Sequence, residues 1–273
     1  MSRPEFEEQE HDRIEDRRPL SGKETFEVVR RAGEEELTRP SISLAWSGLA
    51  AGLAIGFSVI TEAAFMKYLP AEALWTPLIA NMGYTVGFIL VVLARFQLFT
   101  ENTITPVMPI CYAPTSQNLL ALLRNWTVVF SANMVGAILF AIFVIHTAAV
   151  SEEIKNGVLE LGRHAADGSF LKTVVQGIGA GFLIAALVWL LANSRGGELL
   201  IVFVVTYVIA LAGFAHVIAG AVEVAALVLT EAMGVTRAFF GFVVPALLGN
   251  VVGGTVLFTL IAYSQVREEL GQG

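Results

Sequence analysis

The sequence predicts an all-α membrane protein whose six transmembrane helices form two inverted three-helix repeats, with the second and fifth helices broken. Composition is the first reason: 55% of the 273 residues are hydrophobic and 15% are charged, whereas soluble domains carry about 25% charged residues. Charge distribution is the second, because 8 of the 17 basic and 12 of the 24 acidic residues lie in residues 1–40. The rest of the chain has too few polar side chains for a water-exposed surface. An internal repeat is the third reason.

Six stretches of the chain are long enough and apolar enough to cross a bilayer, for which about 20 residues with few charges are needed. Counted between successive charged residues, the uncharged stretches hold 22 to 29 residues. They are residues 40–61, 73–94, 125–151, 173–194, 199–222 and 238–266. An even number of spans places both termini on one side, and basic residues just before the first span favour the cytoplasm for that side. We therefore expect a multi-pass protein of the inner (cytoplasmic) membrane with both termini cytoplasmic.

The chain divides into three regions by charge and hydropathy. In the middle of residues 1–40, Ser21 and Glu24 have the spacing of a capping box. Phe26, Val29 and Leu37 can then line one face of a short amphipathic helix on the membrane surface. A disordered tail to about residue 20, followed by an ordinary solvated helix, explains the same pattern. The regions are a charged cytoplasmic segment at 1–40, a six-helix transmembrane domain at 41–267 and a C-terminal tail at 268–273.

The two halves of the apolar region resemble each other. Residues 48–55 and 177–184 share Gly, Ala, Gly and Ile at matching positions. The pattern Asn-x-x-Gly begins at Asn133 in the third span and at Asn250 in the sixth. Small residues recur wherever membrane helices pack closely, so the shared order is the stronger signal. Because each repeat holds three spans, the second copy crosses in the opposite direction, as in many transporters and channels.

Polar and helix-breaking residues coincide at the end of the second span. Polar side chains cluster in residues 95–103, and Pro106 and Pro109 follow them. Each proline removes a backbone donor, so an unbroken helix is disfavoured there.

The fifth span contains His216, an ionisable side chain in the middle of an apolar stretch. Gly213 and Gly220 flank it, and its predicted counterpart in the first repeat is Phe99-Thr100. An ionisable residue inside a membrane is costly and is a functional candidate by default. A neutral histidine that forms a hydrogen bond between helices is the structural alternative.

Several classes of function find no support in the sequence. The single cysteine, Cys111, excludes an intramolecular disulfide and a thiol cluster. No phosphate-binding loop, dinucleotide fingerprint or metalloprotease motif occurs. We therefore expect no cofactor, no metal and no enzymatic activity, and the net charge of −7 argues against a nucleic acid partner. Glu62 and Glu223 are interpreted as charges at the ends of spans.

Three motifs resemble the formate/nitrite transporter family over about residues 23–267. Gly213-Phe214-Ala215-His216 with Ile218-Ala219 is similar to the family's Gly-Phe-Glu-His-Ser-Ile-Ala in the fifth helix. Leu98-Phe99-Thr100 is similar to its Leu-Phe-Thr in the loop that interrupts the second helix. Residues 249–254 resemble its Gly-Asn-x-x-Gly-Gly in the sixth helix.

The resemblance implies an aquaporin-like fold that assembles as a homopentamer with one pore in each protomer. It implies passage of small monovalent anions or their conjugate weak acids, such as formate, nitrite or hydrosulfide. The candidate pore residues are His216, Thr100, Asn250 and Phe99, with Glu101 beside them. Hydrophobic constrictions are implied at Tyr84, Phe88 and Ile209 on one side and at Leu98, Ile184 and Ala219 on the other. We expect His216 to protonate or hydrogen-bond the permeant, so that protons, the permeant and the lipid bilayer are the partners.

The sequence also departs from the family pattern. Ala215 stands where the family usually has Glu, and Gly181 replaces a common asparagine. No residue aligns with the family's pore lysine, while Glu101 adds an acid next to Thr100. Two alternatives therefore stay open: a non-conducting membrane scaffold or sensor on the same fold, and a neutral-solute channel, although no Asn-Pro-Ala pair typical of water channels occurs.

Overall fold

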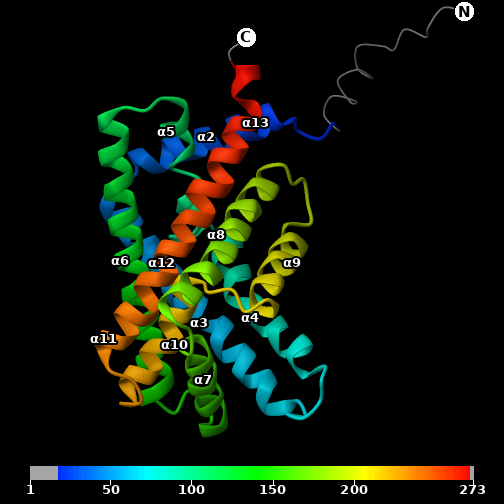
Figure 1. The fold of residues 1–273 in the computed structure, drawn as a ribbon, viewed down its shortest axis with the longest axis vertical. Helices are drawn as coiled ribbons and strands as arrows, with labels where there is room; N and C mark the ends of the chain where they lie inside the picture. The colour runs from blue at the N-terminus through cyan, green and yellow to red at the C-terminus, as the bar shows by residue number, and fades with distance from the viewer. Residues whose placement is uncertain (1–17, 271–273) are drawn as a thin grey trace, which may run out of the picture.

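Long apolar helices dominate the structure. The computed structural model describes residues 18–270, and every regular element within that range is a helix (Figure 1). Among the described residues, five helices are long and apolar enough to cross a membrane. They are α3 (Ser41–Tyr68), α4 (Thr76–Leu93), α6 (Ser116–His146), α8 (Phe170–Ala192) and the continuous helix Val235–Leu270. Residues 1–17 and 271–273 of the predicted terminal regions lie outside the described residues.

Shorter helices complete the fold and divide the predicted fifth span. They are α2 (Gly22–Thr38), α5 (Met108–Tyr112), α7 (Glu152–Ala165), α9 (Glu198–Leu211) and α10 (Val217–Leu229), with a 3-10 turn at Glu101–Thr103. The predicted span 199–222 is therefore not one helix, because α9 and α10 are separated by residues 212–216. The interruption contains Gly213 and His216, the two residues that suggested a break from the sequence.

The last long helix contains two widened segments that the sequence analysis did not predict. It consists of α11 (Val235–Ala238), α12 (Val244–Val251) and α13 (Leu260–Leu270), joined by π-helical turns at Phe239–Val243 and Val252–Thr259. Pro245, which lies two residues after the first widened segment, lacks the N–H that a regular α-helix needs at its position. The Thr259 hydroxyl supports the second widened segment by donating to the Gly254 carbonyl at 2.7 Å.

Glycines at matching repeat positions allow two pairs of helices to cross closely. A Cβ atom at Gly52 of α3 would overlap the carbonyl oxygen of Asn133 in α6. A Cβ atom at Gly181 of α8 would overlap the carbonyl oxygen of Asn250 in α12. Small residues permit this backbone approach in membrane helices. The glycine that replaces the family's asparagine at position 181 therefore has a packing role.

The predicted capping box of α2 is present, but the apolar face of the helix packs against protein. The Ser21 hydroxyl accepts from the Glu24 N–H, and the Glu24 carboxylate accepts from the Ser21 N–H. Phe26 and Val29 are buried, and the Phe26 ring packs against that of Tyr263 in α13. The apolar face of α2 is therefore covered by the protein itself.

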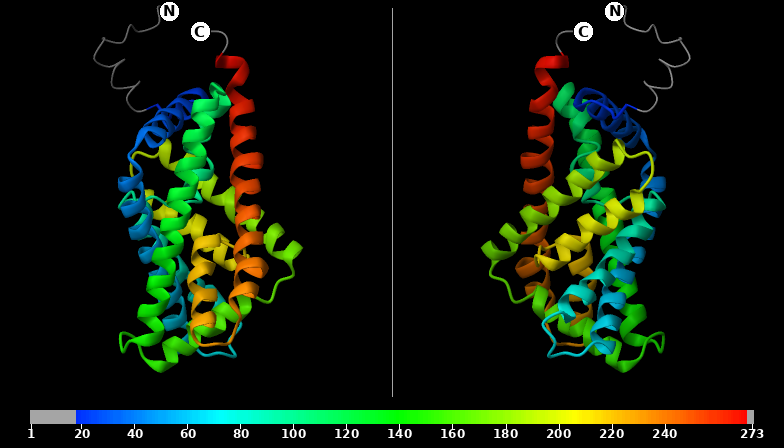
Figure 2. Two further views of the ribbon diagram at one scale, coloured as in Figure 1. Left: turned by 90° about the vertical axis from the view of Figure 1, so that its left-hand side faces the viewer. Right: turned by 90° about the vertical axis from the view of Figure 1, so that its right-hand side faces the viewer.

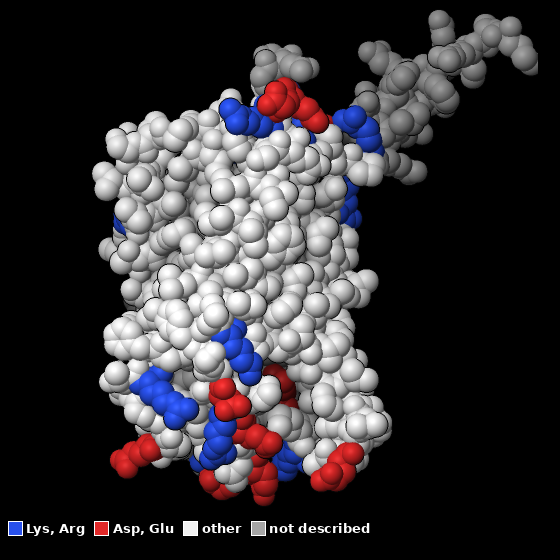
Figure 3. Space-filling model, in the orientation of Figure 1, with Lys and Arg blue, Asp and Glu red and all other residues white. Residues whose placement is uncertain are grey.

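Charged side chains gather at the two ends of the molecule (Figure 3). At one end, α2 packs against α13, and Lys23 donates to the Glu269 carbonyl at 3.2 Å. At the other end, α7 follows α6 (Figures 1 and 2). The broad, largely uncharged band between them in Figure 3 is the surface that a bilayer's hydrocarbon core requires.

Candidate functional site

Helices α4 and α9 are each followed by an exposed residue with a left-handed backbone. Arg95, which follows α4, has a φ of 56°, and Gly213, which follows α9, has a φ of 65°. Glycine adopts this conformation without a steric penalty, so Gly213 was a visible signal for a break. Arg95 has a Cβ atom that disfavours the same conformation, and its role could not be read from the residue type.

One asparagine holds the second break. Asn250 donates to the carbonyl oxygens of Gly177 at 2.9 Å and Ala215 at 2.8 Å. Its Oδ1 atom accepts from the Val217 N–H at 2.9 Å. Both amide protons are thereby used by the backbone. Asn250 fixes the segment that carries His216.

Asn133 holds the first break with a matching set of contacts. It donates to the carbonyl oxygens of Gly48 at 2.7 Å and Gln97 at 2.9 Å, and it accepts from the Phe99 N–H at 2.8 Å. Asn133 in α6 and Asn250 in α12 therefore make the same three kinds of contact, one set in each half of the chain.

The matching contacts also define which residues correspond between the two halves. Gln97 takes the place of Ala215 as a carbonyl acceptor, so Leu98 corresponds to His216. The predicted correspondence between His216 and Phe99-Thr100 is wrong by one residue. The motif similarity alone did not fix the register of the two loops.

His216 and Thr100 join the two breaks. The Nε2 atom of His216 lies 2.7 Å from the Thr100 Oγ1, and its Nδ1 accepts from the Ala219 N–H at 3.2 Å at the start of α10. Because a backbone N–H only donates, Nδ1 carries no proton in this geometry, and Nε2 donates to Thr100. The contact is that of a neutral histidine bonded between two segments. It leaves the proton of the Thr100 hydroxyl available to another acceptor.

Apolar side chains surround this contact. The Phe88 ring meets the His216 ring edge to face at a centroid distance of 4.9 Å, and the Tyr84 ring lies 5.1 Å from Phe88. All six residues expected at constrictions are buried in one core cluster with exposed fractions of 0 to 7%: Tyr84, Phe88, Ile209, Leu98, Ile184 and Ala219. An unpaired ion among such side chains is strongly disfavoured.

The loop after α4 carries the other two candidate residues. Phe99 is 3% exposed and packs against Trp126 of α6. The Oε1 atom of Glu101 is buried without a hydrogen-bond partner in the described part of the chain. The loop is tied to the last long helix by Thr255, whose hydroxyl donates to the Thr103 carbonyl at 2.7 Å. An unpaired buried carboxyl oxygen is unusual, so Glu101 stays a functional candidate.

A cavity of about 900 Å³ reaches from the α7 end of the molecule to His216. We call it the vestibule. Its exposed lining residues include Lys67, Glu153, Glu160, His164 and Lys172. Its buried lining residues include Tyr84, His216, Glu62 and Glu223. Asn250 is not among its lining residues.

Glu62 and Glu223 are not charges at span ends, and that interpretation is corrected. Each is 8% exposed and lines the vestibule, and Glu223 lies in the middle of α10. α7 covers both, with Gly157 against Ala63, the neighbour of Glu62, and Gly162 against the backbone of Glu223. The apolar residues 224–229 were the signal that Glu223 lies inside a helix. No feature of the sequence indicated that α7 packs over Glu62 and Glu223.

Comparisons with known proteins agree with this arrangement. The family model described as "Formate/nitrite transporter" matches residues 23–264. The inner membrane protein YfdC of Escherichia coli K12 is 34% identical over 256 residues, which cover 94% of this chain and 82% of YfdC. The uncharacterized transporter YrhG of Bacillus subtilis 168 is 29% identical over 247 residues, with 88% and 91% covered. The solved structure of a pentameric formate channel with formate bound has a TM-score of 0.71 at 20% identity, covering 84% of this chain and 98% of that channel.

Proposed function

The chain belongs to the formate/nitrite transporter family, and from this premise we propose that it is a membrane channel for small monovalent anions or their conjugate weak acids. Formate, nitrite and hydrosulfide are the expected types of permeant. The observation that carries the proposal is the contact of 2.7 Å between His216 and Thr100. It places polar groups at the meeting point of two helix breaks, within an otherwise apolar interior.

The proposed mechanism follows from the cost of charge in a dry passage. An unpaired anion is expensive in a low-dielectric region, whereas its conjugate acid crosses far more cheaply. The N-terminus of α10 at His216 carries a partial positive charge that favours an approaching anion. The Thr100 hydroxyl, polarised by the His216 ring, then donates a hydrogen bond to the permeant. His216 acts as a hydrogen-bond donor through Thr100 while its Nδ1 caps α10.

The constrictions select for the neutral form. Tyr84, Phe88 and Ile209 would form one slit at the inner end of the vestibule, where His216 also lies, and Leu98, Ile184 and Ala219 would form the second slit. Their burial and the ring contacts of Phe88 support this assignment. Asn250 and Phe99 would shape the passage, Asn250 by fixing the backbone and Phe99 by packing on the loop.

The proposed architecture is six transmembrane helices in two inverted repeats. The paired asparagine contacts and the paired left-handed residues Arg95 and Gly213 support it. We expect a homopentamer, by analogy with the pentameric channel of similar fold. We expect a place in the inner membrane, as the name of YfdC suggests, with both termini in the cytoplasm.

Formate flux into proteoliposomes, followed with a pH-sensitive dye inside the vesicles, tests the function. We expect formate-driven proton uptake that rises as the external pH falls, and we expect His216→Phe to abolish this pH-dependent flux. Thr100→Val should lower it about tenfold, the effect of losing a hydrogen bond of about 1.4 kcal/mol, whereas Thr100→Ser keeps the hydroxyl and should retain most of the flux. Unchanged flux in His216→Phe would contradict the role of the histidine. A wild-type protein that carries no member of a panel of formate, nitrite and hydrosulfide would favour a non-conducting scaffold.

A further inference from the structure

We infer that Glu62, Glu223 and Tyr84 form a proton-donating site in the vestibule, which protonates an incoming weak-acid anion before it reaches Phe88 and His216. This inference rests on the proposed function and names the source of the proton. The Tyr84 ring contacts the ring of Phe88, which itself contacts His216. The site is separate from the contact between His216 and Thr100.

Burial without partners is the first observation. Glu62 and Glu223 are each 8% exposed, and no described residue forms a hydrogen bond or an ion pair with either carboxyl group. The Tyr84 side chain is an independent second observation, because it is 7% exposed, lines the same cavity and has a hydroxyl without a partner in the described range. All three side chains line the cavity and have no partner among the described residues, so their polar atoms open onto the cavity and can contact what enters it.

The surroundings favour a protonated carboxyl over two negative charges. The other titratable and charged groups that line the vestibule are Lys67 on α3, Tyr84 on α4, Glu153, Glu160 and His164 on α7, Lys172 near the start of α8, and His216 beside α10. Lys67 is held by Ser151 at 3.1 Å and Glu153 at 3.4 Å. Lys172 is exposed, near the start of α8, and has no ion pair with either buried acid. Neighbouring carboxyl groups without a cation share a proton more cheaply than they hold two charges.

His216 is unsuited to supply that proton directly. Its Nδ1 accepts from the Ala219 N–H, and its Nε2 faces Thr100, so an imidazolium would place two N–H donors against each other at Nδ1. A carboxyl group in the vestibule has no such conflict. The missing acid at Ala215, beside the histidine, is thereby replaced by acids farther out along the passage.

The proton transfer needs only the carboxyl group, the permeant anion and the water of the vestibule. The O–H bond of a protonated Glu62 or Glu223 breaks as its proton passes to an oxygen of the permeant anion, forming the neutral acid and a carboxylate. The Tyr84 hydroxyl donates a hydrogen bond to the carboxylate that remains. A hydronium ion from the water of the vestibule then restores the carboxyl group. One proton accompanies each anion, and the neutral acid enters the apolar slit.

Glu62→Gln, Glu223→Gln and the double variant test this inference in formate-loaded and formate-free proteoliposomes. Each single substitution should slow proton-coupled formate uptake, and the double substitution should slow it tenfold or more. Glu160→Gln is the matched control, because Glu160 is an exposed acid at the rim of the same cavity and its loss should leave the uptake unchanged. Circular dichroism establishes that each variant is folded. Uptake at the wild-type rate and with the wild-type pH profile in the double variant would overturn the inference.

An infrared measurement separates failure of the site from failure of the proposed function. In a Glu101→Gln background, which removes the buried carboxyl group of the loop after α4, the carbonyl stretch of a protonated carboxyl group should be present at neutral pH with and without Glu160→Gln, and it should be lost when Glu62→Gln and Glu223→Gln are added. If the wild type carries no formate, the proposed function fails, and with it the transfer step. If the wild type carries formate but this band is absent, or persists in the double variant, the proton site alone is wrong.

Discussion

Arg95 and Gly213 occupy equivalent left-handed positions, yet one carries a side chain and the other does not. The left-handed conformation costs a residue with a Cβ atom roughly 1 to 2 kcal/mol relative to glycine. We therefore expect Arg95→Gly to raise the free energy of unfolding by about 1 kcal/mol and Gly213→Ala to lower it by a similar amount. A Cβ atom at Gly213 has no neighbour closer than 4.0 Å, so backbone strain and not a clash is the cause.

Thermal unfolding in detergent measures both substitutions against Arg95→Ala. That control removes the guanidinium and keeps a Cβ atom, so it should not be stabilising. A decrease in melting temperature for Arg95→Gly would mean that the arginine side chain contributes more than the strain costs.

Asn250 offers a second prediction, which separates a structural role from contact with the permeant. Asn250→Asp keeps the shape but leaves the carbonyls of Gly177 and Ala215 facing a second acceptor instead of a donor. Leaving buried groups unpaired costs 1 to 3 kcal/mol, so we expect a loss of about 2 kcal/mol in the free energy of unfolding. Asn133→Asp should cost as much, since its contacts match. Full stability in Asn250→Asp with altered selectivity would instead place this amide in the passage.

Some residues of the site could be predicted from the sequence, and others could not. His216 and Thr100 were predictable, since an ionisable residue in an apolar stretch and a polar loop are both costly inside a membrane. Glu223 was misjudged because counting from charge to charge makes every acid the end of a span. Because the chain breaks after α9, a new helix begins at Val217 and continues to Leu229, and Glu223 lies in the middle of that helix.

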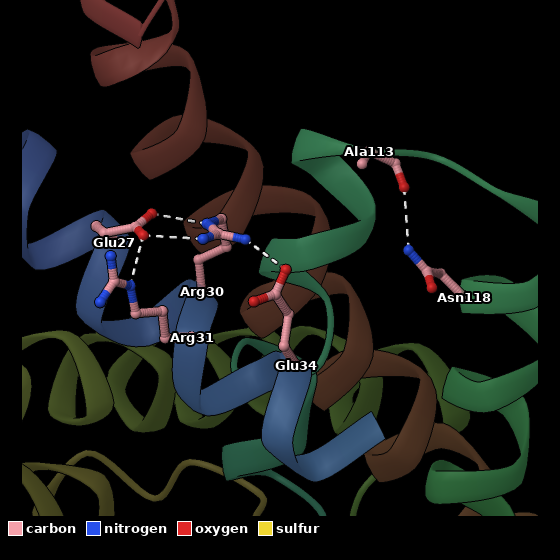
Figure 4. A network of polar contacts seen from close by, with 6 residues as sticks. All are labelled: Glu27, Arg30, Arg31, Glu34, Ala113 and Asn118. Atoms are coloured by element: carbon pink, nitrogen blue, oxygen red, sulfur yellow. Dashed lines mark hydrogen bonds and ion pairs between the residues drawn. The ribbon is translucent and has the colours of Figure 1, made fainter. Parts of the chain in front are cut away.

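At the scale of elements, a charge network within α2 positions the arginine that contacts α5. Glu27 accepts from the Arg30 guanidinium through both oxygens, at 2.7 and 2.8 Å, and from Arg31 at 2.6 Å, while Arg30 also contacts Glu34 (Figure 4). The Arg30 guanidinium lies over the ring of Tyr112 in α5, 5.1 Å from its centroid. Glu27 thus orients the cation that links α2 to α5.

The pKa of Glu27 gives this link a defined pH dependence. The hydrogen bonds from Arg30, together with those from Arg31, lower the pKa of Glu27 from 4.5 to about 2. A depressed pKa contributes stability that is present above the unfolded value and is lost as the pH falls toward the folded value. We expect Glu27→Gln to speed amide hydrogen exchange in residues 22–38 about fivefold at pH 7, corresponding to about 1 kcal/mol for such a network.

The ratio of exchange rates between Glu27→Gln and the wild type should shrink toward one between pH 4.5 and pH 2. Comparison at equal pH removes the intrinsic pH dependence of exchange. Glu35→Gln is a suitable control, because Glu35 lies on the same helix outside this network. A ratio that stays constant over the whole range would show that ionisation of Glu27 does not hold α2 in place.

The elements differ in how much of them the sequence could predict. The capping box that starts α2 and the prolines that disrupt the loop after α4 act locally, so residue types were enough to indicate them. The packing of Phe26 on Tyr263 joins residues more than 200 positions apart, and no local pattern reports it. The π-helical turns near Pro245 depend equally on how the last helix meets its neighbours.

At the scale of the whole molecule, the charge-free stretches predicted the five long apolar helices of the described residues because a bilayer imposes length and apolarity on each segment separately. The vestibule was not predictable in this way. It arises where α7 folds back over α3 and α10, and its buried acids come from helices on opposite sides of the chain's midpoint. The packing of α7 against α3 and α10, and not the composition of the chain, brings Glu62 and Glu223 into one site.

The direction of the molecule in the membrane is the last prediction, and the charges at its two ends carry it. The end with α2 holds Arg30, Arg31 and Arg39, and Arg124 joins them by donating to the carbonyl oxygens of Leu37 and Arg39. The opposite end also carries basic residues, among them Lys67, Lys155 and Lys172, so the direction depends on the basic residues that lie just before α3. Because basic residues close to spans are retained in the cytoplasm, the α2 end should face inward and the vestibule outward.

Single cysteines placed at the two ends test this orientation. In a Cys111→Ser background, which removes the only cysteine, Asp167→Cys lies in the exposed turn between α7 and α8, and Arg195→Cys in the exposed turn between α8 and α9. A membrane-impermeant maleimide should label position 167 in intact cells and position 195 only after the cells are opened. The reverse pattern would place the vestibule in the cytoplasm, and the acid pair would then protonate anions on their way out of the cell instead of on their way in.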